Sequence, residues 1–165
     1  MNPHIRLLTP DDEPFLWIAL YHAVHVSPGE AAPAPEIVRE PRLARYVVEW
    51  MRHLDDIGFA AEVDGAPVGA AWLRRWQQGG HGFGFVDEAT PELSVSLLPG
   101  YRGRGIGTAL LQRLLVEAAQ RFAGVSLSVS ESNPAGRLYE RSGFVIVGES
   151  NGGSVTMERR FVARV

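Results

Sequence analysis

Residues 99 to 110 read Pro99-Gly100-Tyr101-Arg102-Gly103-Arg104-Gly105-Ile106-Gly107-Thr108-Ala109-Leu110 and lie between a predicted strand and a predicted amphipathic helix. The first N–H groups of a helix have no partner inside it, and the helix dipole adds partial positive charge there. Glycines let the backbone come close to a bulky anion, and the two arginines can donate charge-assisted hydrogen bonds to phosphate oxygens. Thr108 adds a hydroxyl at the same end. The stretch therefore predicts a site for a diphosphate group.

Two common diphosphate motifs do not fit this turn. A Walker motif needs a Gly-Lys pair followed by Ser or Thr, and the turn contains no lysine. The dinucleotide motif needs a glycine three positions after its second glycine. A motif starting at Gly103 has Thr108 there, and one starting at Gly105 has Leu110. The alternative is that the glycines bind no ligand and only allow a tight connection between the strand and the helix.

The segments beside the turn predict a strand–helix–strand unit near residues 92 to 129. Residues 92–98 alternate, with apolar residues on one face and serines on the other. Apolar residues spaced by four predict a helix over 105–121, and Gly124 is expected to cap its C-terminus. Residues 125–129 alternate again and predict the second strand.

The rest of the chain predicts further elements, with a hairpin near each end. Capping residues, turn dipeptides and apolar spacing set their bounds. The predicted strands cover 5–8, 59–63, 68–73, 144–147 and 155–159; one helix starts within 9–13 and continues through 21, and others cover 42–54 and 134–141; loops cover 25–36 and 77–84. Asp64-Gly65 and Asn151-Gly152-Gly153 are the predicted hairpin turns. The predicted fold class is mixed α/β.

Composition limits the class of protein. The 165 residues fit one domain, 1–165, and 45% hydrophobic residues suffice for a core. The formal net charge of -3 gives no general basic surface for nucleic acid, and the absence of cysteine excludes disulfides and thiol chemistry. The sequence has no signal peptide and no apolar run of roughly 20 residues, so we expect a cytoplasmic protein that binds no membrane.

Two blocks of sequence resemble the GCN5-related N-acetyltransferase (GNAT) superfamily. The first is the Arg-x-x-Gly-x-Gly pattern that starts at Arg102, and the second is Asn133-Pro134-Ala135-Gly136-Arg137-Leu138-Tyr139-Glu140-Arg141-Ser142-Gly143-Phe144. They support the resemblance over residues 92 to 147, and the N-terminal half agrees only in the order of its elements. The resemblance implies a central mixed, mostly antiparallel twisted sheet of about six to seven strands, flanked by about four helices.

The same resemblance implies an activity and its substrates. A single acetyl-CoA-binding domain would move an acetyl group from acetyl-CoA to the primary amine of a small molecule or peptide, by direct attack in a ternary complex. Dimers are common among similar proteins, so a homodimer is compatible with it. Two other functions stay open: a module of the same fold that senses acyl-CoA without turnover, and an unrelated nucleotide- or phosphate-binding α/β domain.

Carried over residue by residue, the resemblance implies a set of acetyl-CoA ligands. A bulge in the strand before the turn would present the backbone of Leu97 and Leu98 to the pantetheine arm and the thioester carbonyl, where each donor can be worth about 3 kcal/mol. Asn133 would contact the pantetheine arm, and Tyr139 would protonate the departing thiolate. The full set is Leu97, Leu98, Arg102, Gly103, Arg104, Gly105, Ile106, Gly107, Thr108, Asn133 and Tyr139. A helix cap at Asn133 and a core position for Tyr139 are the structural alternatives.

The general base is expected at Glu92. Attack on a thioester needs a neutral amine, so a base or a water path must take a proton. Many similar proteins carry a carboxylate where Glu92 opens the predicted strand 92–98. Asp87, Glu88, His81 and water are the alternative bases, and an exposed glutamate at the strand entry is the structural alternative.

The sequence does not identify the acceptor site. Candidates before residue 92 are Trp17, Tyr21, His22, His25, Trp72, Trp76, Phe83 and Phe85, with Glu30, Glu36, Asp87 and Glu88 as carboxylates for a cationic amine. Aromatic residues at this spacing more often belong to a core. His22 and His25 are expected three apart on one helix, but no third ligand is evident, so we predict no metal site.

Overall fold

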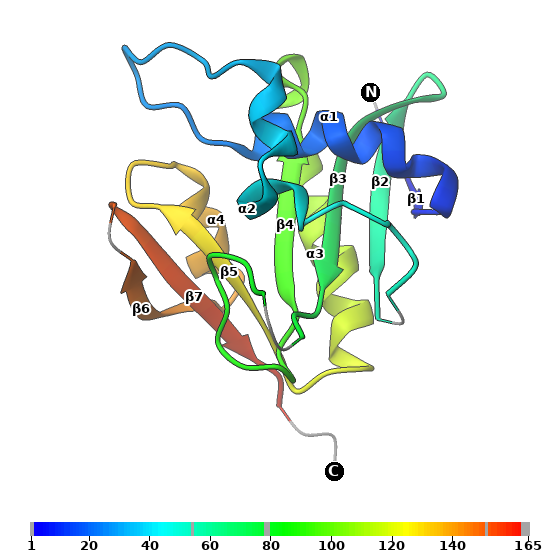
Figure 1. The fold of residues 1–165 in the computed structure, drawn as a ribbon. Helices are drawn as coiled ribbons and strands as arrows, with labels where there is room; N and C mark the ends of the chain where they lie inside the picture. Colours follow the sequence, from blue (N-terminus) through cyan, green and yellow to red (C-terminus); the bar gives the residue numbers. More distant parts are fainter. Residues whose placement is uncertain (1, 54, 78–79, 151, 163–165) are drawn as a thin grey trace.

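The computed structural model describes residues 2–53, 55–77, 80–150 and 152–162, which form one sheet with helices on both faces (Figure 1). The sheet has seven strands in the order β1-β2-β3-β4-β5-β7-β6. The strands are β1 (His4–Leu7), β2 (Ile57–Val63), β3 (Ala66–Arg74), β4 (Glu92–Leu97), β5 (Gly124–Ser130), β6 (Val145–Ser150) and β7 (Ser154–Arg160). This confirms the predicted mixed α/β fold with its mostly antiparallel sheet.

Four α-helices and three short 3-10 helices are found in the described residues. They are α1 (Glu13–Ala23), α2 (Pro41–Ala44), α3 (Ile106–Ala119), α4 (Ala135–Arg141), η1 (Pro10–Asp12), η2 (Pro35–Arg39) and η3 (Pro99–Tyr101). None of these helices is long and apolar enough to cross a membrane.

Alternation along the strands divides the core between the two faces of the sheet. The α3 face buries one hydrophobic cluster, which includes Leu93, Leu110, Leu114, Leu127 and Tyr139. The α1 face buries a second cluster, which includes Leu16, Tyr46, Val47, Trp72 and Trp76. The sheet therefore separates two sets of side chains. Its hydrogen bonding is interrupted at one place.

That break lies between β4 and β5. These strands run parallel and share a single registered pair, Glu92 with Ser126, next to a hydrogen bond of 3.0 Å from the Ser126 N–H to the Pro91 carbonyl. Beyond this pair the strands diverge (Figure 1). On their other edges β4 pairs with β3 and β5 pairs with β7 along their lengths. The predicted strand–helix–strand unit is confirmed as β4–α3–β5.

The two predicted hairpins are present. Asp64 and Gly65 join β2 to β3 with positive φ, 52° and 78°, as a type I′ turn requires. The other hairpin joins β6 to β7, where Gly152 and Gly153 have φ of 120° and 80° and Asn151 lies outside the described residues. Each turn therefore uses residues that tolerate a left-handed backbone.

The helix predicted over residues 42–54, whose last residue lies outside the described part of the chain, is wrong. α2 ends at Ala44 and turns follow it. The cause lies in β3, because the Arg74 guanidinium donates to the carbonyls of Arg45 (2.9 Å) and Val48 (2.7 Å). In a continuing helix those carbonyls would accept N–H groups four residues further on. A buried side chain replaces helical hydrogen bonds here.

Backbone strain accompanies these turns. Glu49 and Met51 have positive φ, 58° and 68°, a conformation that residues other than glycine rarely adopt. Between them Trp50 is buried, and its backbone N–H donates to Glu13 Oε1 at 2.9 Å. Tertiary contacts therefore outweigh the helical pattern of this segment.

The C-cap predicted at Gly124 is also wrong. α3 ends at Ala119, and Gln120 follows in a right-handed conformation. Gly124 instead begins β5 and pairs with Arg160 in β7. A Cβ at this position would lie 2.8 Å from the carbonyl oxygen of Arg159, so close strand packing explains the glycine.

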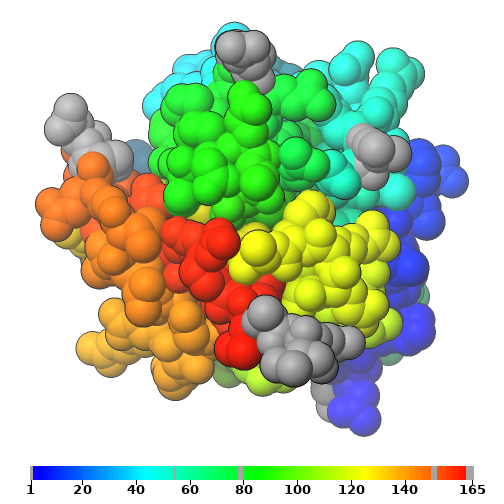
Figure 2. Space-filling model, turned by 90° about the horizontal axis from the view of Figure 1, so that it is seen from below, coloured from blue at the N-terminus to red at the C-terminus, as the bar shows by residue number. Residues whose placement is uncertain are grey.

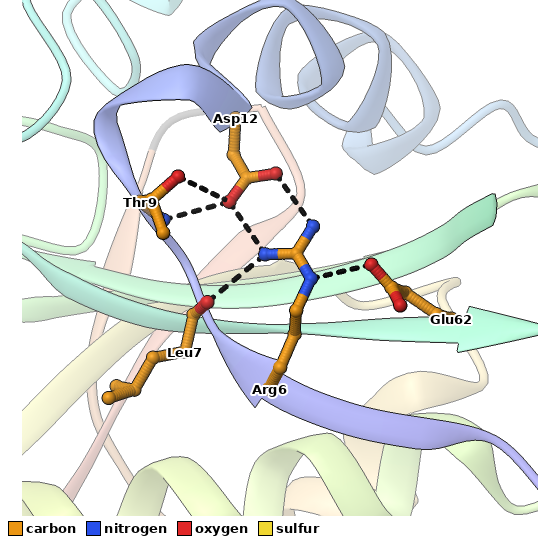
Figure 3. A network of polar contacts seen from close by, with 5 residues as sticks. All are labelled: Arg6, Leu7, Thr9, Asp12 and Glu62. Atoms are coloured by element: carbon orange, nitrogen blue, oxygen red, sulfur yellow. Dashed lines mark hydrogen bonds and ion pairs between the residues drawn. The ribbon is translucent and has the colours of Figure 1, made fainter. Parts of the chain in front are cut away.

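An ion-pair network ties the first strand to the sheet and to the start of α1 (Figure 3). Arg6 donates to Asp12 at 2.8 and 2.9 Å and to Glu62 of β2 at 2.5 Å. Asp12 also accepts the N–H of Thr9 at 2.8 Å. The bond with Arg6 lowers the pKa of Asp12, so this network loses stability as the pH falls and Asp12 takes up a proton.

We expect Asp56→Ala to lower the free energy of unfolding by about 3–5 kcal/mol, because it leaves the Arg74 guanidinium buried without its counter-ion. Arg74 Nη2 lies 2.8 Å from Asp56 Oδ2, and the side chains are 2% and 0% exposed. Glu117→Ala is the control, since it breaks the more exposed pair with Arg121 (3.0 Å) and should cost less than about 1 kcal/mol. Urea denaturation measures both, and equal losses would contradict the role of burial.

Candidate active site

The glycine turn is exposed to solvent. Residues 102–105 are exposed, and Gly103 and Gly105 have φ of 73° and 82°. A Cβ built at either glycine would meet no other atom within 4 Å. The backbone conformation therefore requires these glycines, and the space in front of the turn is open to a ligand.

The N–H groups at the start of α3 have no partner inside the helix. Its first hydrogen bond runs from the N–H of Ala109 to the carbonyl of Gly105 at 3.1 Å. The N–H groups of Ile106, Gly107 and Thr108 precede that bond, and no side chain caps this end. The donors on which the diphosphate prediction depends are thus present, and diphosphate binding stays a prediction.

The turn contains two arginines, Arg102 and Arg104, on either side of Gly103. Arg102 Nη2 donates to the carbonyl of His22, near the end of α1, at 3.0 Å. The Arg104 guanidinium carbon lies 5.7 Å from the ring centre of Tyr101. Burial, and then the charge of Arg102, lower the pKa of His22 and favour the neutral imidazole. The end of α1 therefore adjoins the turn.

His22 and His25 do not share a helix, contrary to the prediction. α1 ends at Ala23, and beyond it His25 Nε2 lies 3.0 Å from Ser132 Oγ. This contact joins the chain after α1 to the turn after β5. Within the described ranges, no group of three or more His, Cys, Asp or Glu residues could hold a metal ion.

The bulge implied for the strand before the turn is absent, which corrects that expectation. The register of β4 with β3 is regular from Glu92 to Leu97, and the Leu98 N–H continues it by donating to the Val68 carbonyl at 2.9 Å. Alternate residues of a strand direct their backbone groups to opposite edges, so those of Leu97 point toward β5. Of the two predicted backbone donors, the Leu97 N–H is the one directed to the break.

Tyr139 lies on α4, on the α3 face of the sheet. It is 8% exposed and packs edge-on against Phe144, with ring centres 5.9 Å apart. Burial raises the pKa of Tyr139 to about 12, so the phenol keeps its proton at neutral pH. Asn133 Oδ1 accepts the N–H of Ala135 at 3.0 Å, so this side chain supports the start of α4 and keeps its amide N–H groups for other contacts.

Glu92 is buried, not exposed at the strand entry. The residue is 3% exposed, and its side chain lies on the α1 face. Oε2 accepts the Tyr46 hydroxyl, while Oε1 accepts Trp76 Nε1 and the Gly84 N–H, each at 3.0 Å. Burial raises the pKa of Glu92 to about 7, although the three donors act to lower it. A carboxylate that titrates near neutral pH suits general base catalysis.

The alternative bases differ from Glu92 in exposure. Asp87 and Glu88 are exposed to solvent. His81 is exposed too and stacks on Phe85, with ring centres 4.4 Å apart. The geometry therefore favours Glu92, whose role as a base stays a prediction.

The aromatic candidates for the acceptor site separate into core and surface. Trp72 and Trp76 are 1% and 5% exposed and belong to the core of the α1 face, whereas Phe83 is 49% exposed. Trp17 and Tyr21 line a surface cavity of about 340 Å³ between α1 and η2. A second cavity of about 430 Å³ lies between α2 and the end of β3. Neither cavity is lined by a residue of the glycine turn.

The sequence did not reveal the role of Tyr46. Tyr46 lies in the segment 42–54, whose apolar spacing predicted a helix, and nothing in the sequence paired it with Glu92. The available signal was a hydroxyl within an apolar stripe, because a buried tyrosine hydroxyl usually finds a hydrogen-bond partner.

The sequence is similar to that of known acetyltransferases. Residues 17–144 match the profile of the acetyltransferase (GNAT) family. The chain is 28% identical over 148 residues to the L-2,4-diaminobutyric acid acetyltransferase of Nocardia farcinica, covering 83% of this chain and 68% of that protein. It is 36% identical over 110 residues to an uncharacterised N-acetyltransferase of Mycobacterium bovis, covering 65% of this chain and 62% of that protein. The matches span about two thirds of the length of these relatives.

The fold is also similar to a solved structure. The yncA protein of Salmonella typhimurium, solved with its cofactor acetyl-CoA, superposes with a TM-score of 0.69 at 23% identity. The superposition covers 100% of this chain and 97% of that chain. The likeness extends over the whole sheet and its helices.

We expect Glu92→Gln to remove a pH dependence of stability. The folded protein raises the pKa of Glu92 from 4.5 to about 7, so between these pH values it holds a proton that the unfolded chain has lost. The wild type should therefore lose stability relative to Glu92→Gln as the pH rises through this range, by at most about 1.4 kcal/mol per pH unit. Urea denaturation of both proteins from pH 4.5 to 8 measures it, and a constant difference would show that Glu92 titrates normally.

Proposed function

The chain belongs to the acetyltransferase (GNAT) family, and we propose that it transfers the acetyl group of acetyl-CoA to a primary amine by direct attack in a ternary complex. The observation that carries this proposal is the exposed start of α3 beside the break between β4 and β5. One end of this arrangement suits a diphosphate, and the other contains a buried carboxylate.

The start of α3 supports binding of acetyl-CoA through its pyrophosphate. The N–H groups of Ile106, Gly107 and Thr108 have no partner inside the helix, and the helix dipole favours an anion there. Arg102 and Arg104 add positive charge beside them. The yncA protein, which shares the fold, was solved with acetyl-CoA. Acetyl-CoA is therefore the proposed cosubstrate.

The break in the sheet supports a place for the pantetheine arm. Beyond Glu92 and Ser126 the facing edges of β4 and β5 have no registered pair, so their backbone groups are left for another partner. An extended chain that contains amides can pair with such an edge as a strand would. Leu97 on β4 and Asn133 after β5 are the proposed contacts.

The chemistry needs one group that takes a proton and one that gives a proton. The amine nitrogen attacks the thioester carbonyl, the C–N bond forms, and the C–S bond breaks. Glu92 takes the proton that the amine loses, and Tyr139 donates a proton to the departing thiolate. Glu92 packs with the cluster of the α1 face and Tyr139 belongs to that of the α3 face, so acceptor and acetyl-CoA would approach the break from opposite sides.

The acceptor is proposed to be an amine on a small molecule or a peptide. The Nocardia relative is named for acetylation of L-2,4-diaminobutyric acid, which makes this diamino acid the first amine to test. The fluorescent or chromogenic detection of free thiol suits this protein, because the chain has no cysteine to react with the reagent.

The test incubates the protein with acetyl-CoA and a panel of amines that includes L-2,4-diaminobutyrate, and measures the release of free CoA thiol. We expect release with at least one amine, and a decrease of tenfold or more in kcat for Tyr139→Phe with unchanged CoA affinity, because this variant removes the proton donor. No release across the panel would count against the enzyme, and full activity of Tyr139→Phe would count against the proposed acid.

We expect Gly105→Val to abolish CoA binding, measured by isothermal titration calorimetry. Valine at a φ of +82° is strained, and its β-branched side chain would enter the open space where a phosphate must approach the N–H groups. Gly100→Val is the matched control, since a Cβ at Gly100 also meets no atom within 4 Å but that backbone is not left-handed. Retained CoA affinity in Gly105→Val would show that the site lies elsewhere.

A further inference from the structure

Tyr46 makes two hydrogen bonds that fix the direction of its hydroxyl. The Phe83 N–H donates to the Tyr46 oxygen at 2.8 Å, and the Tyr46 hydroxyl donates to Glu92 Oε2. A backbone N–H can only donate, so the hydroxyl proton is directed toward the carboxylate. Burial, and then the Glu92 charge, raise the pKa of Tyr46, so the phenol keeps this proton.

The other carboxylate oxygen is bound by two further groups that can only donate. Trp76 Nε1 and the Gly84 N–H both donate to Glu92 Oε1. The carboxylate is therefore held by three segments: the one after α2, the residues just after β3, and the loop before β4. Each of these bonds favours the charged form of Glu92 against the effect of burial.

The loop before β4 can take this position only because two of its residues are glycine. A Cβ at Gly82 would collide with the Tyr46 hydroxyl and with Glu92 Oε1. A Cβ at Gly84 would lie 2.5 Å from the carbonyl carbon of Leu127 in β5. This link between β3 and β4, green in Figure 2, forms the surface beside the ends of β7 and α3.

The segment that carries Tyr46 is held by side chains of the α1 face and contains backbone strain. Trp72 Nε1 donates to the Tyr46 carbonyl at 3.0 Å, and the Tyr46 ring packs edge-on against Trp76 at 5.1 Å. The same segment contains the positive φ angles of Glu49 and Met51. Strain of this kind persists where the surrounding structure imposes it and is frequent near functional sites.

We propose that Tyr46 is a positioning residue for Glu92: its hydroxyl fixes the carboxylate against the backbone of Phe83 and Gly84 and stabilises the charged form that accepts a proton. The inference rests on the proposed function, in which Glu92 is the base. Tyr46 touches neither substrate in this account and acts through Glu92.

The charged groups around this pair belong to three elements. His81 on the loop lowers the pKa of Glu92, and Arg45 on the segment after α2 lowers that of Tyr46. Arg74, the register partner of Glu92 in β3, is bound to Asp56 at 2.8 Å. Tyr46→Phe retains all of these charged side chains.

The test is a ¹³C NMR titration of glutamate carboxyl groups, with the Glu92 signal assigned from Glu92→Gln. In Tyr46→Phe the midpoint of Glu92 should rise by about one pH unit, a tenfold gain in proton affinity, because one donor to the charged form is lost. Tyr21→Phe is the matched control, since it removes a tyrosine hydroxyl that donates to the Pro33 carbonyl at 2.7 Å, and it should leave the midpoint unchanged. An unchanged midpoint in folded Tyr46→Phe overturns the inference.

If Tyr46→Phe does not fold, the same titration of Glu92 can be made without this substitution. Incorporation of 3-fluorotyrosine makes the phenol a stronger donor, so the Glu92 midpoint should fall, and an unchanged or higher midpoint overturns the inference. The titration does not depend on turnover. If Glu92→Gln retains full acetyl transfer, the proposed base is wrong, and that result is distinct from a failure of Tyr46 to shift the midpoint.

Discussion

The parting of β4 from β5 after one residue pair is the constraint on which the rest of the site depends. A fully paired sheet would separate Glu92 on the α1 face from Tyr139 on the α3 face. The two parallel strands are paired at Glu92 and Ser126. At the other end of β4, the exposed glycine turn leads into α3. In the proposed function, the backbone hydrogen-bonding groups left by the break would bind the extended cosubstrate.

Burial of polar groups on the α1 face is the second determinant. Arg74 is held by Asp56 and by carbonyls of the chain after α2, and Glu92 is held by Tyr46, Trp76 and Gly84. Charged groups removed from water are costly unless they are paired and hydrogen-bonded. Here the pairing is complete around Arg74, while at Glu92 burial still exceeds the effect of the donors and leaves a group that titrates near neutral pH.

Local patterns predicted the parts of the fold that local physics determines. Alternation identified the strands, Asp64-Gly65 identified a turn that needs positive φ, and alternating glycines before an amphipathic helix identified the exposed start of α3. Contacts between distant segments were not predictable in this way. The apolar stripe after α2 suggested a helix, but Arg74 takes its carbonyls, and the pairing of Tyr46 with Glu92 has no signature in sequence. Gly124 looked like a helix cap because it follows the apolar pattern of the predicted helix. Its close approach to the Arg159 carbonyl in β7 is known only from the fold.

The most direct measurement of the central claim is a ¹⁵N–¹H NMR titration of the labelled protein with CoA. The account predicts that the largest amide shifts lie at residues 103–108 and along the facing edges of β4 and β5, at Leu97 and Ser128. Shifts confined to either surface cavity, beside Trp17 or beside Arg45, with residues 103–108 unaffected, would contradict it.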